Sequence, residues 1–178
     1  MLNLSQRNPL WADTIIGLSA SDLGGNGCLI TALCDIWSKF YYNPKNKKYL
    51  RPDQAVKEWV FTAIAGDSDP RYLVWSSINH SGMKFIWRQN SWKPKEFMVD
   101  PVTGEKELMG DLVAKYARHK DYGVVFQVIN SKGNQHWIAV ISKSFFGWAC
   151  NDPWNGKRLW MAPYPYKYIS GFSLIKKS

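Results

Sequence analysis

The sequence predicts an α+β protein, in which a helical first half packs on a mostly antiparallel β-sheet formed by the second half. Apolar residues recur three and four positions apart in the first half, as on one face of a helix. The second half instead contains β-branched and aromatic runs bounded by turn residues. Because no internal repeat or low-complexity stretch divides the chain, we expect residues 1–178 to form a single domain with its own core.

The clearest helix is predicted from Cys28 to Tyr41. Its apolar stripe consists of Leu29, Ala32, Leu33, Ile36 and Phe40. The preceding GGNG is expected to form a turn that opens this helix. A second helix is predicted from Pro52 to Ala65, because proline suits the first helical turn and apolar residues recur at helical spacing. A third is expected from Asp69 to Ile78.

The predicted sheet is built from runs rich in valine, isoleucine and aromatic residues. These runs cover residues 83–89, 122–130, 136–143, 145–152 and 168–176. Between the first two, the segment 104–120 contains the pattern of another helix, around Asp111 to Arg118. We expect the strands to pair in antiparallel fashion.

Composition restricts the class of protein. Hydrophobic residues make up 46% and charged residues 21% of the chain, which is typical of a globular protein rather than a disordered one. Three cysteines are too few and too widely spaced for a disulfide framework or a zinc ribbon, and no nucleotide-binding motif is present. We expect no export signal and no membrane span, which leaves a cytoplasmic or virion-associated location open.

The charge of the chain favours an acidic partner. The formal net charge is +9, and the chain contains ten tryptophans, whose flat rings suit stacking on sugars or bases as well as core packing. An anionic polymer such as a cell-wall glycan or nucleic acid is therefore a candidate partner. The basic segment 45–51 is interpreted as a solvated loop.

Cys28 is the candidate nucleophile. It lies at the predicted start of a helix, where unpaired backbone N–H groups and the helix dipole favour a thiolate. Gly24, Gly25 and Gly27 would let a substrate backbone approach, and a backbone N–H at Cys28 could face a developing oxyanion. A cysteine at a helix start is also a common structural residue, so this position alone does not decide the function.

His136 and Asp152 are the candidate partners of Cys28. His136 begins the strand HWIAVIS, and Asp152 follows sixteen residues later at the end of the next strand. An antiparallel hairpin would bring the two side chains together. A carboxylate there would fix the imidazole tautomer and stabilise the imidazolium that forms when the thiol loses its proton.

The remaining cysteines and histidines are expected to have structural roles. Cys34 lies on a different face of the nucleophile helix and is expected to be buried. Cys150 shares a strand side with Asp152, and packing is its expected role. His80 and His119 are expected to be ordinary surface or core residues.

Four segments together indicate a family. They are LSQRNPLWADTIIG, GGNGCLITALCDI, QHWIAVISK and WACNDPWNGK, which extend over nearly the whole chain. On these segments the sequence resembles the papain-like cysteine peptidases, closest to the double-glycine-leader (bacteriocin-processing) type found in bacteria and phages. The resemblance implies a papain-like fold, no metal or other cofactor, and amide hydrolysis through a thioester acyl-enzyme.

The resemblance also implies a fourth site residue. In that family a glutamine upstream of the cysteine donates to the oxyanion, and Gln6 is the matching position. Gln6 precedes Cys28 by 22 residues, so the insertion PLWADTIIGLSASD must loop out for the two to meet. Asp22 has a closer spacing, but a carboxylate cannot donate to an oxyanion.

Three function classes stay open from sequence. The first is a cysteine peptidase or amidase acting on a peptide or peptidoglycan-like substrate, as a phage or bacterial endopeptidase would. The second is an acyltransferase of transglutaminase type that uses the same triad. The third is a non-enzymatic basic module that binds nucleic acid or protein, for which steep salt dependence would survive Cys28→Ala.

Overall fold

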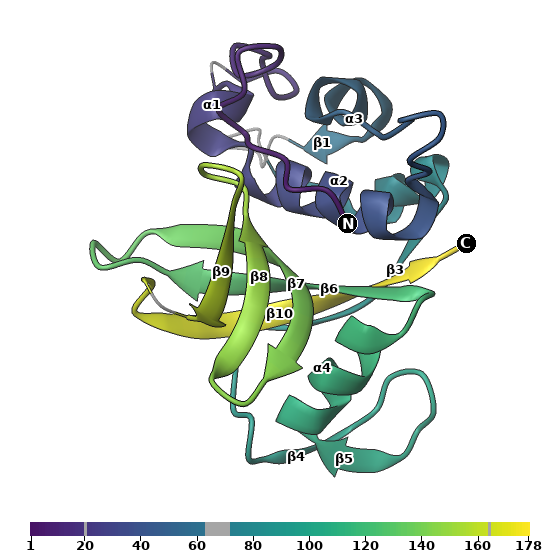
Figure 1. Ribbon diagram of the computed structural model, residues 1–178, viewed down its shortest axis with the longest axis vertical. Coiled ribbons are helices and arrows are strands. Elements are labelled where there is room, and N and C mark those ends of the chain that lie inside the picture. The colour runs from purple at the N-terminus through teal and green to yellow at the C-terminus, as the bar shows by residue number, and fades with distance from the viewer. Residues whose placement is uncertain (20, 63–71, 164) are drawn as a thin grey trace.

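A six-stranded antiparallel sheet forms the centre of the α+β fold (Figure 1). The computed structural model describes residues 1–19, 21–62, 72–163 and 165–178. Across the sheet the strands follow the order β3 (Met83–Gln89), β10 (Tyr168–Lys177), β6 (Tyr122–Ile129), β7 (Gln135–Ser144), β8 (Gly147–Asp152) and β9 (Lys157–Ala162). Each neighbouring pair is antiparallel.

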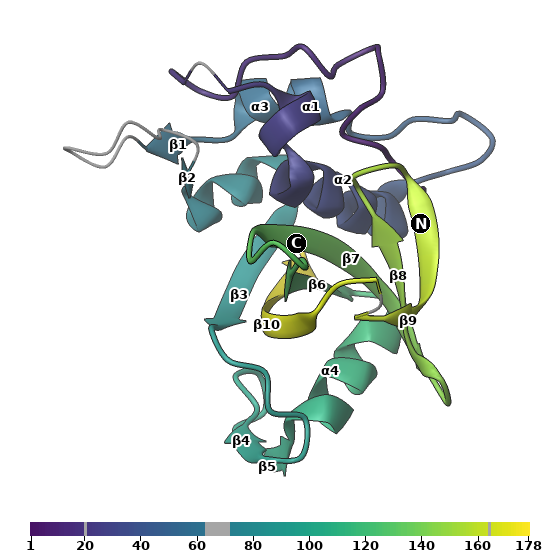
Figure 2. The same ribbon diagram turned by 90° about the vertical axis from the view of Figure 1, so that its left-hand side faces the viewer.

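Helices cover both faces of this sheet (Figures 1 and 2). One face carries α1 (Leu23–Asn26), α2 (Cys28–Tyr41), α3 (Pro52–Glu58) and the 3₁₀ helix η1 (Trp75–Ser81). The other carries α4 (Met109–Arg118), beside the small sheet of β4 (Phe97–Val99) and β5 (Lys106–Leu108). A second small sheet joins β1 (Phe61–Thr62) to β2 (Tyr72–Leu73).

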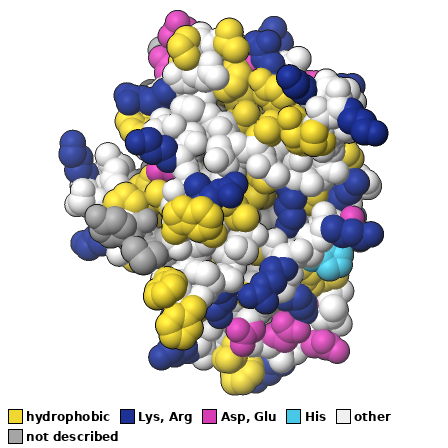
Figure 3. Space-filling view, in the orientation of Figure 1, with side chains coloured by type: hydrophobic (Ala, Val, Ile, Leu, Met, Phe, Trp, Pro, Cys, Tyr) yellow, Lys and Arg dark blue, Asp and Glu magenta, His cyan; other side chains and the backbone are white. Residues whose placement is uncertain are grey.

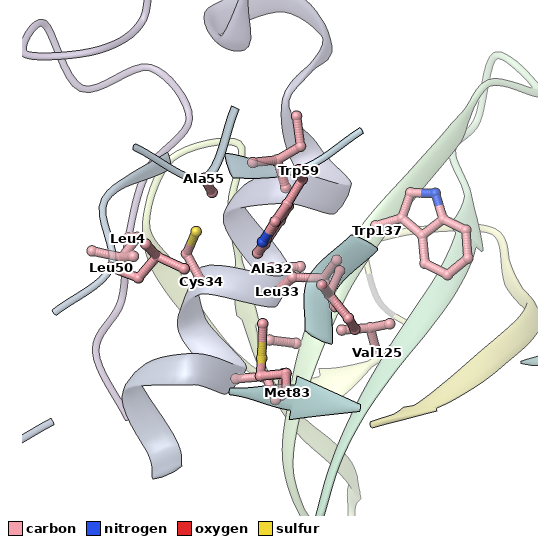
Figure 4. Packing of buried hydrophobic residues seen from close by; sticks show 14 of the residues in the cluster. Leu4, Ala32, Leu33, Cys34, Leu50, Ala55, Trp59, Met83, Val125 and Trp137 are labelled. Atoms are coloured by element: carbon pink, nitrogen blue, oxygen red, sulfur yellow. The ribbon is translucent and has the colours of Figure 1, made fainter. Parts of the chain in front are cut away.

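Each face of the sheet has its own core. Side chains alternate between the two faces along β6. Val125 packs in the cluster that includes α2, whereas Val124 and Phe126 pack in the cluster that includes α4. Figure 4 shows the first cluster, with side chains of α2 beside Val125 and Met83. The helix comes so close to β6 that a Cβ at position 123 would collide with Ile36, which explains Gly123. This packing fixes the position of the N-terminal end of α2.

The structure confirms the predicted helix from Cys28 to Tyr41 and all five predicted strand regions, with ends shifted by up to two residues. The prediction of a turn at GGNG was wrong. The first three residues of this segment belong to the short helix α1. The side chain of Asp22 caps this helix by accepting from the Gly25 N–H at 2.7 Å.

The two less regular helices were predicted too long. The helix expected from Pro52 to Ala65 ends at Glu58, because Trp59 turns to an extended conformation and is buried in the core. In place of a helix up to Ile78, the chain forms β2 and then η1, a 3₁₀ helix. Residues 63–65 and 69–71 of these two predictions lie outside the described residues.

Candidate active site

Cys28 is the first residue of α2 and borders a cleft. Gly27 separates it from α1, and the carbonyl of Gly27 accepts the Thr31 N–H at 2.9 Å, so the hydrogen bonding of α2 starts there. The side chain of Cys28 is partly exposed and lines a cleft of about 1010 Å³. Unpaired N–H groups of the first helical turn thus lie at the edge of an open space that a ligand can enter.

The β7–β8 hairpin brings His136 and Asp152 into contact, as the sequence predicted. Ala139 pairs with Asn151, so His136 and Asp152 are offset by two residues and meet diagonally. The Nε2 atom of His136 lies 2.7 Å from Oδ1 of Asp152, and both side chains are buried. Because Nε2 is engaged by the carboxylate, Nδ1 is the ring nitrogen left for a second partner.

Cys28 and Asp152 both raise the pKa of His136. Burial alone would lower the pKa of His136, but hydrogen bonds with Asp152 and with Cys28 outweigh burial and raise it to about 9. The imidazolium is therefore the favoured form of His136 at neutral pH. A cation beside the sulfur stabilises the thiolate form of a cysteine by Coulomb attraction.

Tyr166 contacts the second carboxylate oxygen of Asp152 and was not predicted from the sequence. Its hydroxyl donates to Oδ2 of Asp152 at 2.7 Å, and its ring stacks on His136 with centroids 5.2 Å apart. The Trp154 N–H donates to Oδ1 at 2.9 Å. Burial would raise the pKa of Asp152, but these donors and His136 lower it below its ordinary value. Asp152 is thus held as a carboxylate.

Gln6 lies in the same cleft despite its distance along the sequence. Its backbone N–H donates to the Pro153 carbonyl at 2.7 Å, and its side-chain Nε2 donates to the Gly24 carbonyl at 2.8 Å. These bonds tie the N-terminal segment to the β8–β9 turn and to α1. The residues after Gln6 loop out and return through a bridge between Ile15 and Asp22. The structure therefore brings Gln6, Cys28 and His136 to one cleft, and the buried Asp152 joins them through its contact with His136.

Aromatic and basic residues form part of the remaining cleft lining. Trp75, Trp137 and Trp154 line it, together with Arg88 and Lys132. No aspartate or glutamate is found among the described residues of this lining. Over the same described ranges, no group of three or more histidine, cysteine or acidic side chains is arranged to hold a metal ion.

Cys28 differs from the other two cysteines in its access to the cleft. Cys34 and Cys150 are fully buried, as predicted for Cys34, and burial raises the pKa of both thiols. Cys150 packs in the cluster that includes α4 and does not line the cleft. His80 and His119 are exposed and lie outside the cleft lining.

Sequence reasoning missed Tyr166 and Arg88. Tyr166 lies in the connection from β9 to β10, and because β9 was not predicted, nothing indicated that this connection returns to Asp152. A signal was available: the apolar run from Leu159 to Ala162 lies between the turn residues Gly156 and Pro163, which is typical of a strand. Comparisons of the chain with protein-family models, curated proteins and solved structures gave no match.

Proposed function

We propose that the protein is a papain-like cysteine hydrolase, with Cys28 as nucleophile, His136 as general base and Asp152 as the orienting carboxylate. One observation carries the proposal: a cysteine at a helix N-terminus interacts with a histidine whose far nitrogen is held by a buried carboxylate, at the edge of a cleft. These three elements are the requirements for activating a thiol.

In the acylation step the Cys28 sulfur attacks the carbonyl carbon of an amide, after its proton has moved to His136. The carbonyl oxygen gains negative charge in the tetrahedral intermediate. Collapse of this intermediate breaks the C–N bond, and the amine leaves with the proton from His136. A thioester remains on Cys28.

The oxyanion needs donors already in place. The first N–H groups of α2 have no intrahelical partner, and that of Cys28 is the nearest to the sulfur. The Nε2 group of Gln6 carries a second N–H besides the one donated to Gly24, so Gln6 can serve as the other donor. In the deacylation step His136 takes a proton from water, which attacks the thioester and releases the acid.

A peptide amide is the substrate class that this site suits. The cleft has a volume of about 1010 Å³, and its tryptophans offer flat apolar walls. Net charge +9 favours attraction to an anionic polymer. We therefore propose peptide cross-links of bacterial peptidoglycan as the first substrates to test, in the role of a phage or bacterial endopeptidase.

The test of the enzyme class uses p-nitrophenyl acetate, which needs no knowledge of the natural substrate. Cys28 should displace p-nitrophenolate and become acetylated, so the release should show a burst of about one equivalent per protein molecule. Mass spectrometry of acid-quenched protein should place the acetyl group on Cys28. Cys28→Ala should lose the burst, and His136→Ala should slow it strongly.

His80→Ala is the matched control, since His80 is an exposed histidine outside the cleft, and it should leave the burst unchanged. Added glycinamide separates hydrolysis from acyl transfer, because a transferase would form acetylglycinamide in preference to acetate. A burst of the same size in Cys28→Ala would refute the proposed nucleophile.

A further inference from the structure

Arg88 is a cation in the cleft without a carboxylate partner. It extends from β3, and its Nε atom is buried without any hydrogen-bond partner. Its Nη2 atom reaches only Oε1 of Gln127, at 3.4 Å. No ion pair connects Arg88 to an acidic residue in the part of the chain that the structure describes.

An unpaired, half-buried guanidinium is unfavourable unless something else compensates it. Burial disfavours the charged form of Arg88 and lowers its pKa. The nearest aromatic contact is the ring of Trp137, whose centroid lies 5.1 Å from the guanidinium carbon. A cation–π contact of this kind stabilises the charge but supplies no acceptor for the N–H groups. Among the described residues, most of the hydrogen-bonding capacity of Arg88 therefore remains unused.

The position of Arg88 relates it to the reacting residues. Trp137 directly follows His136 on β7 and pairs with Gln127, the residue that Arg88 contacts. Trp75 packs on Trp137, with ring centroids 5.9 Å apart, and lines the same cleft. Arg88, Trp75, Trp137 and His136 thus all line the same cleft.

Lys132, the other basic residue of the cleft lining, is more exposed to water than Arg88. Lys132 lies in the exposed turn between β6 and β7, where water screens its charge. Lysine and arginine side chains are spread over the face shown in Figure 3, whereas most acidic side chains in view gather at its upper and lower ends. Apart from the imidazolium of His136, which faces Asp152 and Cys28, the cleft therefore offers a negative charge on a substrate its strongest local attraction at Arg88.

We propose that Arg88 and the rings of Trp75 and Trp137 form a subsite for a carboxylate of the substrate. This inference rests on the proposed function and narrows it, since the scissile amide then belongs to a peptide that carries a free carboxylate near the bond. A guanidinium binds a carboxylate through two parallel N–H···O bonds, which its two terminal Nη groups can supply. The tryptophans hold the apolar part of the same substrate residue.

Three alkylating probes of nearly identical shape test this subsite. They are iodoacetyl-glutamine amide, which is neutral, iodoacetyl-glutamate α-amide, with a side-chain carboxylate, and iodoacetyl-glutamine, with an α-carboxylate. In each, the Cys28 sulfur displaces iodide. After correction for reactivity with glutathione, one of the acids should alkylate Cys28 about tenfold faster than the neutral probe. The faster acid identifies which carboxylate of a peptide the subsite takes.

Variants assign the preference to Arg88. Arg88→Gln should abolish the preference for the acid, measured as the ratio of its alkylation rate to that of the neutral probe. An unchanged circular dichroism spectrum shows that the fold of the variant is intact. Arg88→Lys should retain part of it, because the charge stays and the paired donors are lost. Lys132→Gln also removes one positive charge from the cleft and should change the preference for the acid by less than about twofold.

Two results would overturn the subsite: equal rates for all three probes, or an acid preference that persists in Arg88→Gln. If Cys28 proves inert to every probe, the proposed function fails. Binding of a carboxylate at the subsite is then measured without any reaction, in Cys28→Ala. There, glutarate but not glutaramide should shift the ¹H–¹⁵N Nε resonance of Arg88, which is assigned by its absence in Arg88→Gln. An equal response to both compounds would rule out the subsite.

Discussion

At the scale of single residues, the candidate site consists of a chain of hydrogen bonds that ends at Tyr166. The sequence indicated Cys28, His136 and Asp152 because helix starts and hairpins follow from local patterns. It could not indicate Tyr166, because the contact of its hydroxyl with Asp152 depends on how the β9–β10 connection folds back. Arg88 was missed for a similar reason: its neighbour Trp137 lies on a strand that is distant in sequence.

The hydroxyl of Tyr166 gives the prediction at this scale. Tyr166→Phe removes one donor from Asp152 but leaves the ring stacked on His136, so we expect acylation by p-nitrophenyl acetate to slow about tenfold. The pKa of Asp152 should rise, which moves the acid limb of the rate–pH profile to higher pH. Tyr168→Phe, an exposed tyrosine on the adjacent strand, is the control. An unchanged rate and profile would exclude a positioning role for Tyr166.

At the scale of elements, the junction between α1 and α2 sets the direction of Cys28. The long apolar stripe of α2 and the strands were predictable because their patterns are regular. The four-residue helix α1 was not, since a run of glycines is more typical of a turn. Its formation depends on the Asp22 cap and on contacts with the N-terminal loop, where the Gly24 N–H donates to the Ala12 carbonyl at 2.7 Å.

Gly27 at this junction gives the second prediction. A Cβ there would lie 2.7 Å from the Leu23 carbonyl oxygen, so Gly27→Ala forces α1 and the start of α2 apart. We expect a loss of about 1–3 kcal/mol in the free energy of unfolding, together with slower alkylation of Cys28 by iodoacetamide.

Gly25→Ala is the control for this substitution, since its nearest neighbour is a side-chain oxygen of Asp22 at 3.3 Å. Urea titration and labelling rates measure both effects. A Gly27→Ala protein with normal stability and a normal labelling rate would show that the junction does not position Cys28.

At the scale of the whole molecule, the first six residues join the helical layer to the sheet. The Leu4 N–H donates to Oδ1 of the buried Asp35 on α2 at 2.9 Å, and the side-chain amide of Asn151 on β8 donates to the Leu2 carbonyl. The Gln6 N–H extends this connection to the β8–β9 turn. Such contacts between segments that are distant in sequence carry no local sequence signal, so Gln6 was predicted from the family resemblance alone. Among the described residues, no helix is long and apolar enough to cross a membrane.

Asp35 makes the stability of this arrangement depend on pH. Burial raises the pKa of Asp35 well above its ordinary value of 3.8, more than its hydrogen bonds lower it. The folded protein therefore holds a proton that the unfolded chain releases, and stability falls as pH rises from about 4 toward the raised pKa. Among the described residues Oδ2 of Asp35 has no hydrogen-bond partner, and this oxygen is free to carry the proton.

In Asp35→Asn, an amide N–H takes the place of the carboxyl proton and is present at every pH. We expect the variant to be more stable than wild type at neutral pH, by on the order of 1 kcal/mol, and the difference to shrink near pH 4. Urea denaturation at several pH values measures this. A variant that is less stable at every pH would show that Asp35 acts as a carboxylate.

The most direct test of the central claim is alkylation by iodoacetamide across pH, with mass spectrometry reporting which of the three cysteines reacts. Because the pKa of His136 is raised to about 9, its imidazolium should make Cys28 react at lower pH than an ordinary thiol, while the buried Cys34 and Cys150 stay unmodified. His136→Ala should remove the reaction at low pH. Ordinary thiol reactivity at Cys28, unchanged by the loss of His136, would contradict the account.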